Sequence, residues 1–192
     1  MSDSIQLPTD LETERDALVA EILAAFEHVS REGGVSWTEA MVIDDEGSSA
    51  ERRAARRQDT DQNWIELLDD EQWHPLGGVG GFSFLDAAGF RYYLPAAMIH
   101  TIHHGARTGL DAGVLTLNKA TKPDGFSQRE WHLEKWSRLD DRQRRCVARF
   151  LRYLIASEEA LVDDYVASDW RTAYERYWNT VDELNGMPEK SE

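Results

Sequence analysis

The stretch Phe82-Ser-Phe-Leu-Asp-Ala-Ala-Gly-Phe-Arg-Tyr-Tyr-Leu-Pro-Ala-Ala-Met98 contains the densest group of aromatic side chains in the chain. Because aromatic residues bury large apolar areas, this stretch predicts the centre of the hydrophobic core. Pro95 suits the first turn of a helix, where its missing amide hydrogen costs nothing. We therefore expect a helix from Pro95 through Ile102.

Helical patterns lie on both sides of this stretch. Apolar residues recur at helical spacing from Leu18 to Val29, and aromatic and apolar residues do so from Trp170 to Leu184. Four pairs have the spacing of a helix-starting capping box: Thr9 with Glu12, Ser36 with Glu39, Ser48 with Glu51, and Asp140 with Gln143. The patterns predict a mainly α fold, a single helical domain over residues 9–184 with flexible ends at 1–8 and 185–192.

Three segments lack a clear helical period. Val114–Leu117 is either a turn or part of a short strand pair, and Gly77–Gly81 is expected to be a flexible connector. The segment from Asp59 to Glu71 has no lysine or arginine, and we expect it to form a loop with short helical turns anchored by tryptophans. Its six acids are Asp59, Asp61, Glu66, Asp69, Asp70 and Glu71.

Charge and cysteine content limit the classes of function. The 192 residues carry a formal net charge of −15, which opposes binding to nucleic acid or to anionic membranes. Cys146 is the lone cysteine, and its helical context predicts a small buried side chain. The amino-terminal residues lack the pattern of a secretory signal, so the sequence predicts a cytoplasmic protein. No cofactor is expected.

A family resemblance covers residues 34–155. The motif Ile43-Asp-Asp-Glu-Gly-Ser48, the core stretch Phe82–Met98 and the run Phe150-Leu-Arg-Tyr-Leu154 resemble an uncharacterised family of bacterial proteins. The resemblance implies a shared fold and carries no known activity. Trp37, Glu46 and Ala97 depart from the family pattern, and these changes would alter a shared pocket.

Four polar residues are candidates for a binding site. Arg91 interrupts an apolar run that includes Tyr93, so its guanidinium requires either a bound ligand or a carboxylate such as Asp44, Asp59 or Asp86. We expect Arg91 to be buried, and its replacement by alanine to cost about 3–5 kcal/mol. Glu39 and Asp44 lie near the turn at Gly47, where paired carboxylates can bind a hard cation, act as acid and base, or have only capping and solvated roles.

Histidines offer an alternative site. The spacing of His100, His103 and His104 places His100 on the same helix face as either of the other two. Two histidines on one face can chelate a transition metal. A third ligand is missing from the pattern, and histidines at a helix end also interact well with the helix dipole. We therefore expect no tightly bound metal.

The remaining patterns indicate contacts between surfaces. Arg142, Arg145, Arg149 and Arg152 follow one helix face, where they can pair with the chain's own carboxylates. The aromatic stripe from Trp170 is expected to dock on the main domain or on a partner. No catalytic constellation is evident, so the sequence favours an interaction module that binds another protein, with an enzyme or metal-binding protein using His100 and His104 as the alternative.

Overall fold

The computed structural model describes residues 9–71, 73–75, 81–117, 128–161 and 164–183. Every regular element in these ranges is a helix or helical turn, so the predicted mainly α fold is confirmed. Val114 lies in a 3-10 turn, η2 (Ala112–Leu115), and no strand occurs in the described ranges. The predicted flexible ends at 1–8 and 185–192, and most of the predicted connector at 77–81, lie outside the described residues.

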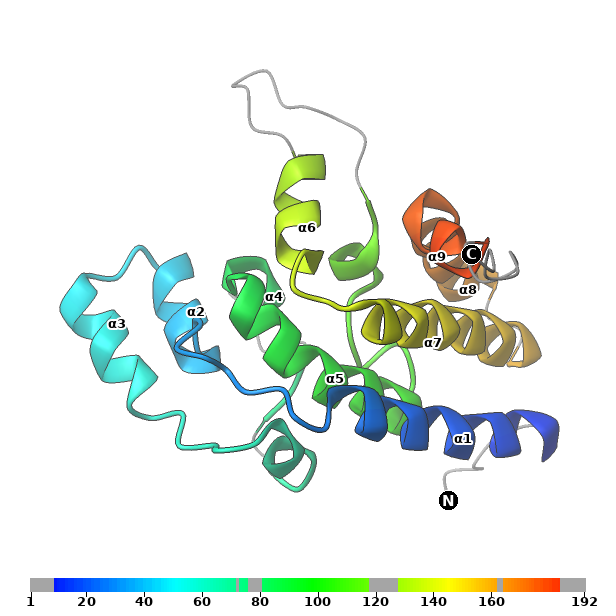
Figure 1. Cartoon of the computed structure of the whole chain (residues 1–192), viewed down its shortest axis with the longest axis horizontal. Coiled ribbons are helices and arrows are strands. Elements are labelled where there is room, and N and C mark those ends of the chain that lie inside the picture. Colours follow the sequence, from blue (N-terminus) through cyan, green and yellow to red (C-terminus); the bar gives the residue numbers. More distant parts are fainter. Residues whose placement is uncertain (1–8, 72, 76–80, 118–127, 162–163, 184–192) are drawn as a thin grey trace, which may run out of the picture.

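Three long helices organise the core. Helix α1 (Thr9–Phe26) packs against α5 (Ala87–His104) and α7 (Asp141–Ala160), and α8 (Asp164–Ala173) lies along α7. Figure 1 shows α1 and α7 running side by side, with the pair α2 and α3 at the opposite end of the molecule. One hydrophobic core includes side chains from all four packed helices.

Helix α5 contains most of the stretch Phe82–Met98 that was expected to form the core centre, and all residues of α5 before His103 are buried or partly buried. Tyr92, Tyr93 and Leu94 are at most 1% exposed, which confirms the expectation. The predicted start at Pro95 is wrong, because α5 begins eight residues earlier at Ala87. Asp86 caps this earlier start by accepting a hydrogen bond from the amide of Gly89 at 2.8 Å, and Pro95 lies inside the helix.

The capping pattern correctly predicted the short helices before the core. Helices α2 (Trp37–Asp44) and α3 (Ser49–Arg56) begin directly after Ser36 and Ser48. In both, the backbone amide of the serine donates to the glutamate three residues later. Asp140 and Gln143 make the corresponding pair at the start of α7. Trp37 is thereby fixed as the first residue of a helix, and its ring is only 6% exposed.

The middle of the chain connects these helices through short turns. A 3-10 turn, η1 (Trp64–Leu68), packs on α5, and the indole nitrogen of Trp64 donates to the carbonyl of Phe26 at 2.9 Å. This confirms the expected loop with tryptophan-anchored turns. Helix α4 (Gly81–Phe84) contacts α2, and α6 (Gln128–Trp136) contacts α5.

The carboxy-terminal helical segment docks on the main domain, as one of the two sequence alternatives predicted. It begins with α8, continues through a π-helical turn, η3 (Tyr174–Trp178), and ends with α9 (Asn179–Glu183). Trp170 and Trp178 are at most 1% exposed. The indole nitrogen of Trp178 donates to the carbonyl of Leu115 at 2.9 Å, and Arg144 of α7 donates to the Tyr177 hydroxyl.

Candidate functional site

Tyr93 connects α5 to the chain segment that precedes α2. Its ring is fully buried, and its hydroxyl oxygen accepts hydrogen bonds from the backbone amide of Trp37 at 3.0 Å and from the Arg31 guanidinium at 2.8 Å. Burial raises the pKa of Tyr93 above its ordinary value, so the hydroxyl stays neutral at physiological pH. Of the four predicted binding residues, Tyr93 is the one that holds Trp37 in place, and Trp37 lines the cavity described below.

Asp61 is held beside Tyr93 by two partners. Its carboxylate accepts a hydrogen bond from the Tyr92 hydroxyl at 2.6 Å and forms an ion pair with Arg31 at 3.4 Å. The Asp61 side chain is 10% exposed. Burial, followed by the hydrogen bond to Asp61, raises the pKa of Tyr92, which keeps that hydroxyl a donor. Arg31 thus compensates one carboxylate in this region.

Asp59 is oriented by neutral donors. Both of its carboxylate oxygens accept from Thr38, one from the backbone amide at 2.8 Å and one from the hydroxyl at 2.6 Å. Thr38 is the second residue of α2, where the free amides and the helix dipole favour a negative charge. The amino end of α2 therefore holds a carboxylate in a fixed orientation.

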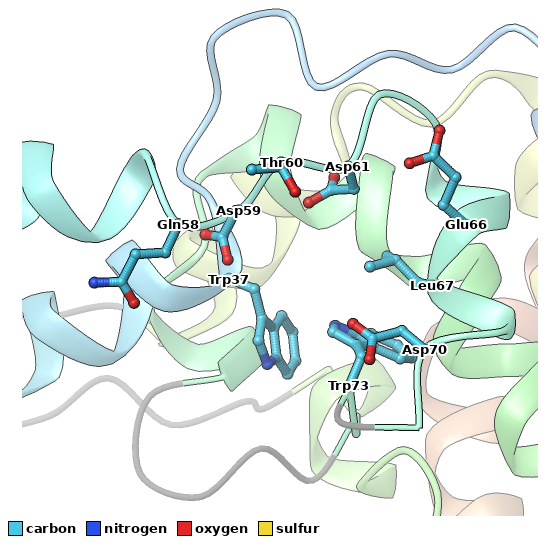
Figure 2. A pocket seen from close by; sticks show the side chains of 9 residues that line it. All are labelled: Trp37, Gln58, Asp59, Thr60, Asp61, Glu66, Leu67, Asp70 and Trp73. Carbon is cyan, nitrogen blue, oxygen red and sulfur yellow. The ribbon is translucent and has the colours of Figure 1, made fainter.

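These carboxylates lie at the edge of a cavity of about 260 Å³, which we call the acidic pocket. In Figure 2 the side chains of Asp59, Asp61 and Asp70 and the rings of Trp37 and Trp73 surround the same space, with Glu66 on its outer side. No lysine, arginine or histidine is among the described residues that line it. The full lining is Trp37, Gln58, Asp59, Thr60, Asp61, Glu66, Leu67, Asp70 and Trp73.

Two tryptophans form the apolar wall of the acidic pocket. The ring centroids of Trp37 and Trp73 are 5.3 Å apart at 54°, so the rings contact each other at an angle, and both residues line the cavity. Trp73 is 7% exposed, and its indole nitrogen has no hydrogen-bond partner among the described residues. In Figure 2 this nitrogen lies on the ring edge turned toward Trp37 and the pocket. Four carboxylates and an aromatic wall together form a site suited to a cation.

Glu39 and Asp44 do not line the acidic pocket. Glu39 accepts from the amide of Ser36 at 3.3 Å and forms an ion pair with Arg56 at 2.6 Å, so its role is the capping and pairing role that the sequence offered as one alternative. Asp44 is the last residue of α2, and one of its carboxylate oxygens is buried without a hydrogen-bond partner among the described residues. Among the described residues, no hydrogen bond or ion pair joins Glu39 to Asp44.

Arg91 contacts a carboxylate, as predicted, but this carboxylate is Glu32 and not one of the three named acids, and the Arg91 side chain is only partly buried. Its side chain is 24% exposed, its Nε donates to Gln143 at 3.0 Å, and its nearest carboxylate is Glu32 at 3.9 Å. Asp59 and Asp86 are engaged elsewhere, with Thr38 and with the start of α5. Through its hydrogen bond to Gln143, Arg91 joins α5 to α7. It does not line the acidic pocket.

Replacing Arg91 by alanine is expected to lower the free energy of unfolding by about 1–2 kcal/mol, because one charge-assisted hydrogen bond is lost while a half-exposed Glu32 can be solvated. This is less than the 3–5 kcal/mol that a fully buried pair would give. Urea denaturation measures the difference. Arg138→Ala removes the other arginine on Glu32 and should cost less than about 1 kcal/mol. A loss above about 3 kcal/mol for Arg91→Ala would contradict the half-buried pairing.

The histidines gather at the carboxyl end of α5. The rings of His100 and His104 have centroids 4.4 Å apart, and His74 adds a third ring 4.9 Å from His100. Burial and the neighbouring histidines lower the pKa of His100 to about 4. In the described ranges, no group of three histidine, cysteine, aspartate or glutamate side chains is placed to hold a metal ion.

Two further predictions concern α7. Cys146 is fully buried, and burial raises the pKa of its thiol to about 12, which confirms its role as a small apolar side chain. Arg149 pairs with Glu14 and Glu21 of α1, which confirms pairing with the chain's own carboxylates for that arginine. Arg142, Arg145 and Arg152 are exposed.

The site that sequence reasoning missed is the acidic pocket itself. The acidic segment from Asp59 to Glu71 and its tryptophans were visible in the sequence, but they were interpreted as a loop. Trp37 lies more than twenty positions earlier, and only the fold brings it to this loop. The usable indication was a short segment that combines several acids with tryptophans and has no lysine or arginine of its own, since anchoring alone does not require the acids.

Fold and pocket define this chain as a mainly α-helical protein with an acid-lined, tryptophan-walled cavity. The chain belongs to a family of unknown function, DUF6714, whose model matches residues 14–182. The uncharacterised-family prediction is thus confirmed. Its extent is corrected, because the match continues well beyond residues 34–155 and includes the carboxy-terminal aromatic helix.

Two other comparisons add no relative. No curated protein and no solved structure matches the chain significantly. Within the described part of the chain, none of the helices has the length and apolarity needed to cross a membrane.

Proposed function

We propose that this chain is a non-enzymatic binding module whose acidic pocket takes the positively charged group of a ligand or partner. The observation that carries the proposal is a 260 Å³ cavity with four carboxylates, two tryptophan rings and no basic residue among its described lining. Pockets for drug-sized ligands are typically about 300–1,000 Å³, so this one suits a single charged group of side-chain size.

The charge balance around the pocket supports a cationic ligand. Arg31 pairs with Asp61, whereas the donors to Asp59 are the neutral groups of Thr38. Glu66 accepts from a backbone amide, that of Gln62. A bound cation would reduce the mutual repulsion of these carboxylates, and its apolar faces would contact the indoles. The net charge of −15 adds long-range attraction for basic partners.

The lining also supports binding over nucleophilic catalysis. Among the described lining residues of the acidic pocket there is no serine, cysteine, lysine or histidine, so no pair of such a nucleophile with a histidine base lies there, and the carboxylates of Asp59 and Asp61 are held as hydrogen-bond acceptors. The same proposal places the protein in the cytoplasm of a bacterium, which the lone buried Cys146 supports. It also names another protein as the partner, which the strong negative charge supports. The metal-binding alternative at His100 and His104 would be favoured by stoichiometric zinc in untagged protein.

Ethylguanidinium is a direct probe of the proposal, because it supplies a cation and little else. The indole N–H resonances of Trp37 and Trp73 should shift in a saturable manner as the probe is added, and raising the salt concentration should weaken binding by screening the carboxylates. The other tryptophans, including the fully buried Trp64 and Trp136, should not respond.

A pair of matched double variants tests the carboxylates. Replacing Glu66 by glutamine together with Asp70 by asparagine should weaken ethylguanidinium binding by about tenfold, since each exposed charge contributes up to roughly 1 kcal/mol. The control replaces Asp69 by asparagine and Glu71 by glutamine, two exposed acids of the same loop that do not line the pocket. The control should bind within about twofold of the parent protein. Equal weakening in both variants would mean that general surface charge, and not the pocket, attracts the probe.

A further inference from the structure

We infer that the natural occupant of the acidic pocket is an arginine side chain within a peptide segment, and that a backbone carbonyl of that segment accepts a hydrogen bond from the indole nitrogen of Trp73. The inference rests on the proposed function and names its ligand class. The ligand must supply a planar cation that contacts the carboxylates and the indoles at the same time. It must also supply a hydrogen-bond acceptor close to that cation.

The walls of the pocket favour a guanidinium over an ammonium group. Trp37 and Trp73 contact each other at 5.3 Å between centroids, so a cation does not lie between them and would contact the indoles from the cavity that both line. A planar guanidinium stacks on aromatic faces and still directs its N–H groups toward carboxylates at its edge, whereas an ammonium is a compact and strongly hydrated charge. The carboxylates of Asp59 and Asp61 are fixed by Thr38 and Tyr92, and so are preoriented acceptors for those N–H groups.

The indole nitrogen of Trp73 supplies the second, independent observation. Trp73 is 7% exposed, and its N–H has no acceptor among the described residues. A buried donor without an acceptor is costly, and nearly all such groups in folded proteins find a partner. Asp59 and Asp61 do not need this donor for their orientation, because Thr38 and Tyr92 already donate to them.

A peptide provides the missing acceptor together with the cation. In Figure 2 the Trp73 nitrogen lies on the edge of the ring nearest the pocket, beside the surface on which a guanidinium would stack. A neutral carbonyl is preferable to a carboxylate as the acceptor, because the four acids of the lining repel an anion. Arginine in a peptide chain carries neutral carbonyls on both sides of its side chain, while free arginine carries a carboxylate.

Three probes separate the contribution of the guanidinium from that of the neutral carbonyls. Ethylguanidinium has only the cation, Nα-acetyl-L-arginine N-methylamide adds two neutral carbonyls, and Nα-acetyl-L-lysine N-methylamide changes the guanidinium to an ammonium. We expect the blocked arginine to bind at least about tenfold more tightly than ethylguanidinium and several-fold more tightly than the blocked lysine. Calorimetric or NMR titration of the full chain measures all three dissociation constants.

Trp73→Phe tests the indole N–H, because it keeps an aromatic ring and removes the donor. In the variant the blocked arginine should bind no more tightly than ethylguanidinium, because both probes lose the same stacking on the indole and only the blocked arginine also loses the hydrogen bond. Its melting temperature shows whether the fold is retained. An independent readout uses the parent protein alone: the Trp73 N–H resonance should move downfield with the blocked arginine and less with ethylguanidinium.

The outcomes distinguish the inference from the function beneath it. If ethylguanidinium and the blocked arginine both fail to bind, the proposed function itself is wrong. If ethylguanidinium binds but the blocked arginine has no advantage, or keeps its advantage in folded Trp73→Phe protein, the peptide inference is overturned while cation binding stands. If the blocked lysine binds as tightly as the blocked arginine, the guanidinium preference is overturned.

Discussion

Replacing Trp178 by alanine is expected to lower the free energy of unfolding by about 3–5 kcal/mol, as for other fully buried tryptophans. Its ring is 0% exposed and packs against Trp136 with centroids 4.9 Å apart. The variant also leaves the carbonyl of Leu115 without the indole donor that lies at 2.9 Å. Urea denaturation monitored by circular dichroism measures the change.

Tyr165 is the matched control for this variant, because it lies in α8 of the same carboxy-terminal segment and is 79% exposed. Tyr165→Ala should change stability by less than about 0.5 kcal/mol. If Trp178→Ala also stays within about 1 kcal/mol of the parent protein, the carboxy-terminal helices contribute little to the core, and the docked arrangement would be contradicted.

Acidification is expected to destabilise the protein through His132, which is 4% exposed in α6. Burial, and then the charge of Lys135, lowers the pKa of His132 from 6.5 to about 4. Below pH 6.5 His132 becomes protonated in the unfolded chain but stays neutral in the folded chain, so the free energy of unfolding falls as the pH drops toward 4. Between pH 7 and pH 4.5 this one group should cost about 2 kcal/mol.

His132→Phe isolates that contribution, because it keeps an aromatic ring beside Trp131 and Trp136 and removes the titrating group. The variant should lose about 2 kcal/mol less than the parent protein over this pH range, while carboxylate titration affects both alike. His28→Phe is the control, since His28 is 91% exposed on its side chain. If His132→Phe and the parent protein have parallel pH profiles, His132 does not remain neutral in the fold.

Local chemistry predicted much of the helical framework. The pairs Ser48 with Glu51 and Asp140 with Gln143 predicted two helix starts, because a capping box depends only on residues three positions apart. The start of α5 was missed for a related reason. Asp86 lacks a glutamate or glutamine partner at the capping spacing, so Pro95 was the more evident start, although tertiary packing tolerates it inside a buried helix.

The acidic pocket could not be predicted in the same manner. Asp61 is oriented by Tyr92 and Arg31, and Trp37 is held by Tyr93, so these three contacts join residues at least 30 positions apart. Periodicity carries no information about such pairs. The sequence did indicate that Arg91 needed a partner, but Glu32 and Gln143 became its neighbours only through the packing of α5 on other segments.

Intermolecular NOE measurements with Nα-acetyl-L-arginine N-methylamide test the central claim most directly, because they locate the bound cation on the chain. At saturation, the side-chain methylene protons of the probe should give cross-peaks to the ring protons of Trp37 and Trp73, which form the wall of the acidic pocket. Cross-peaks to partly exposed aromatic rings elsewhere, such as Trp131 or Tyr177, without any to Trp37 or Trp73, would contradict the account.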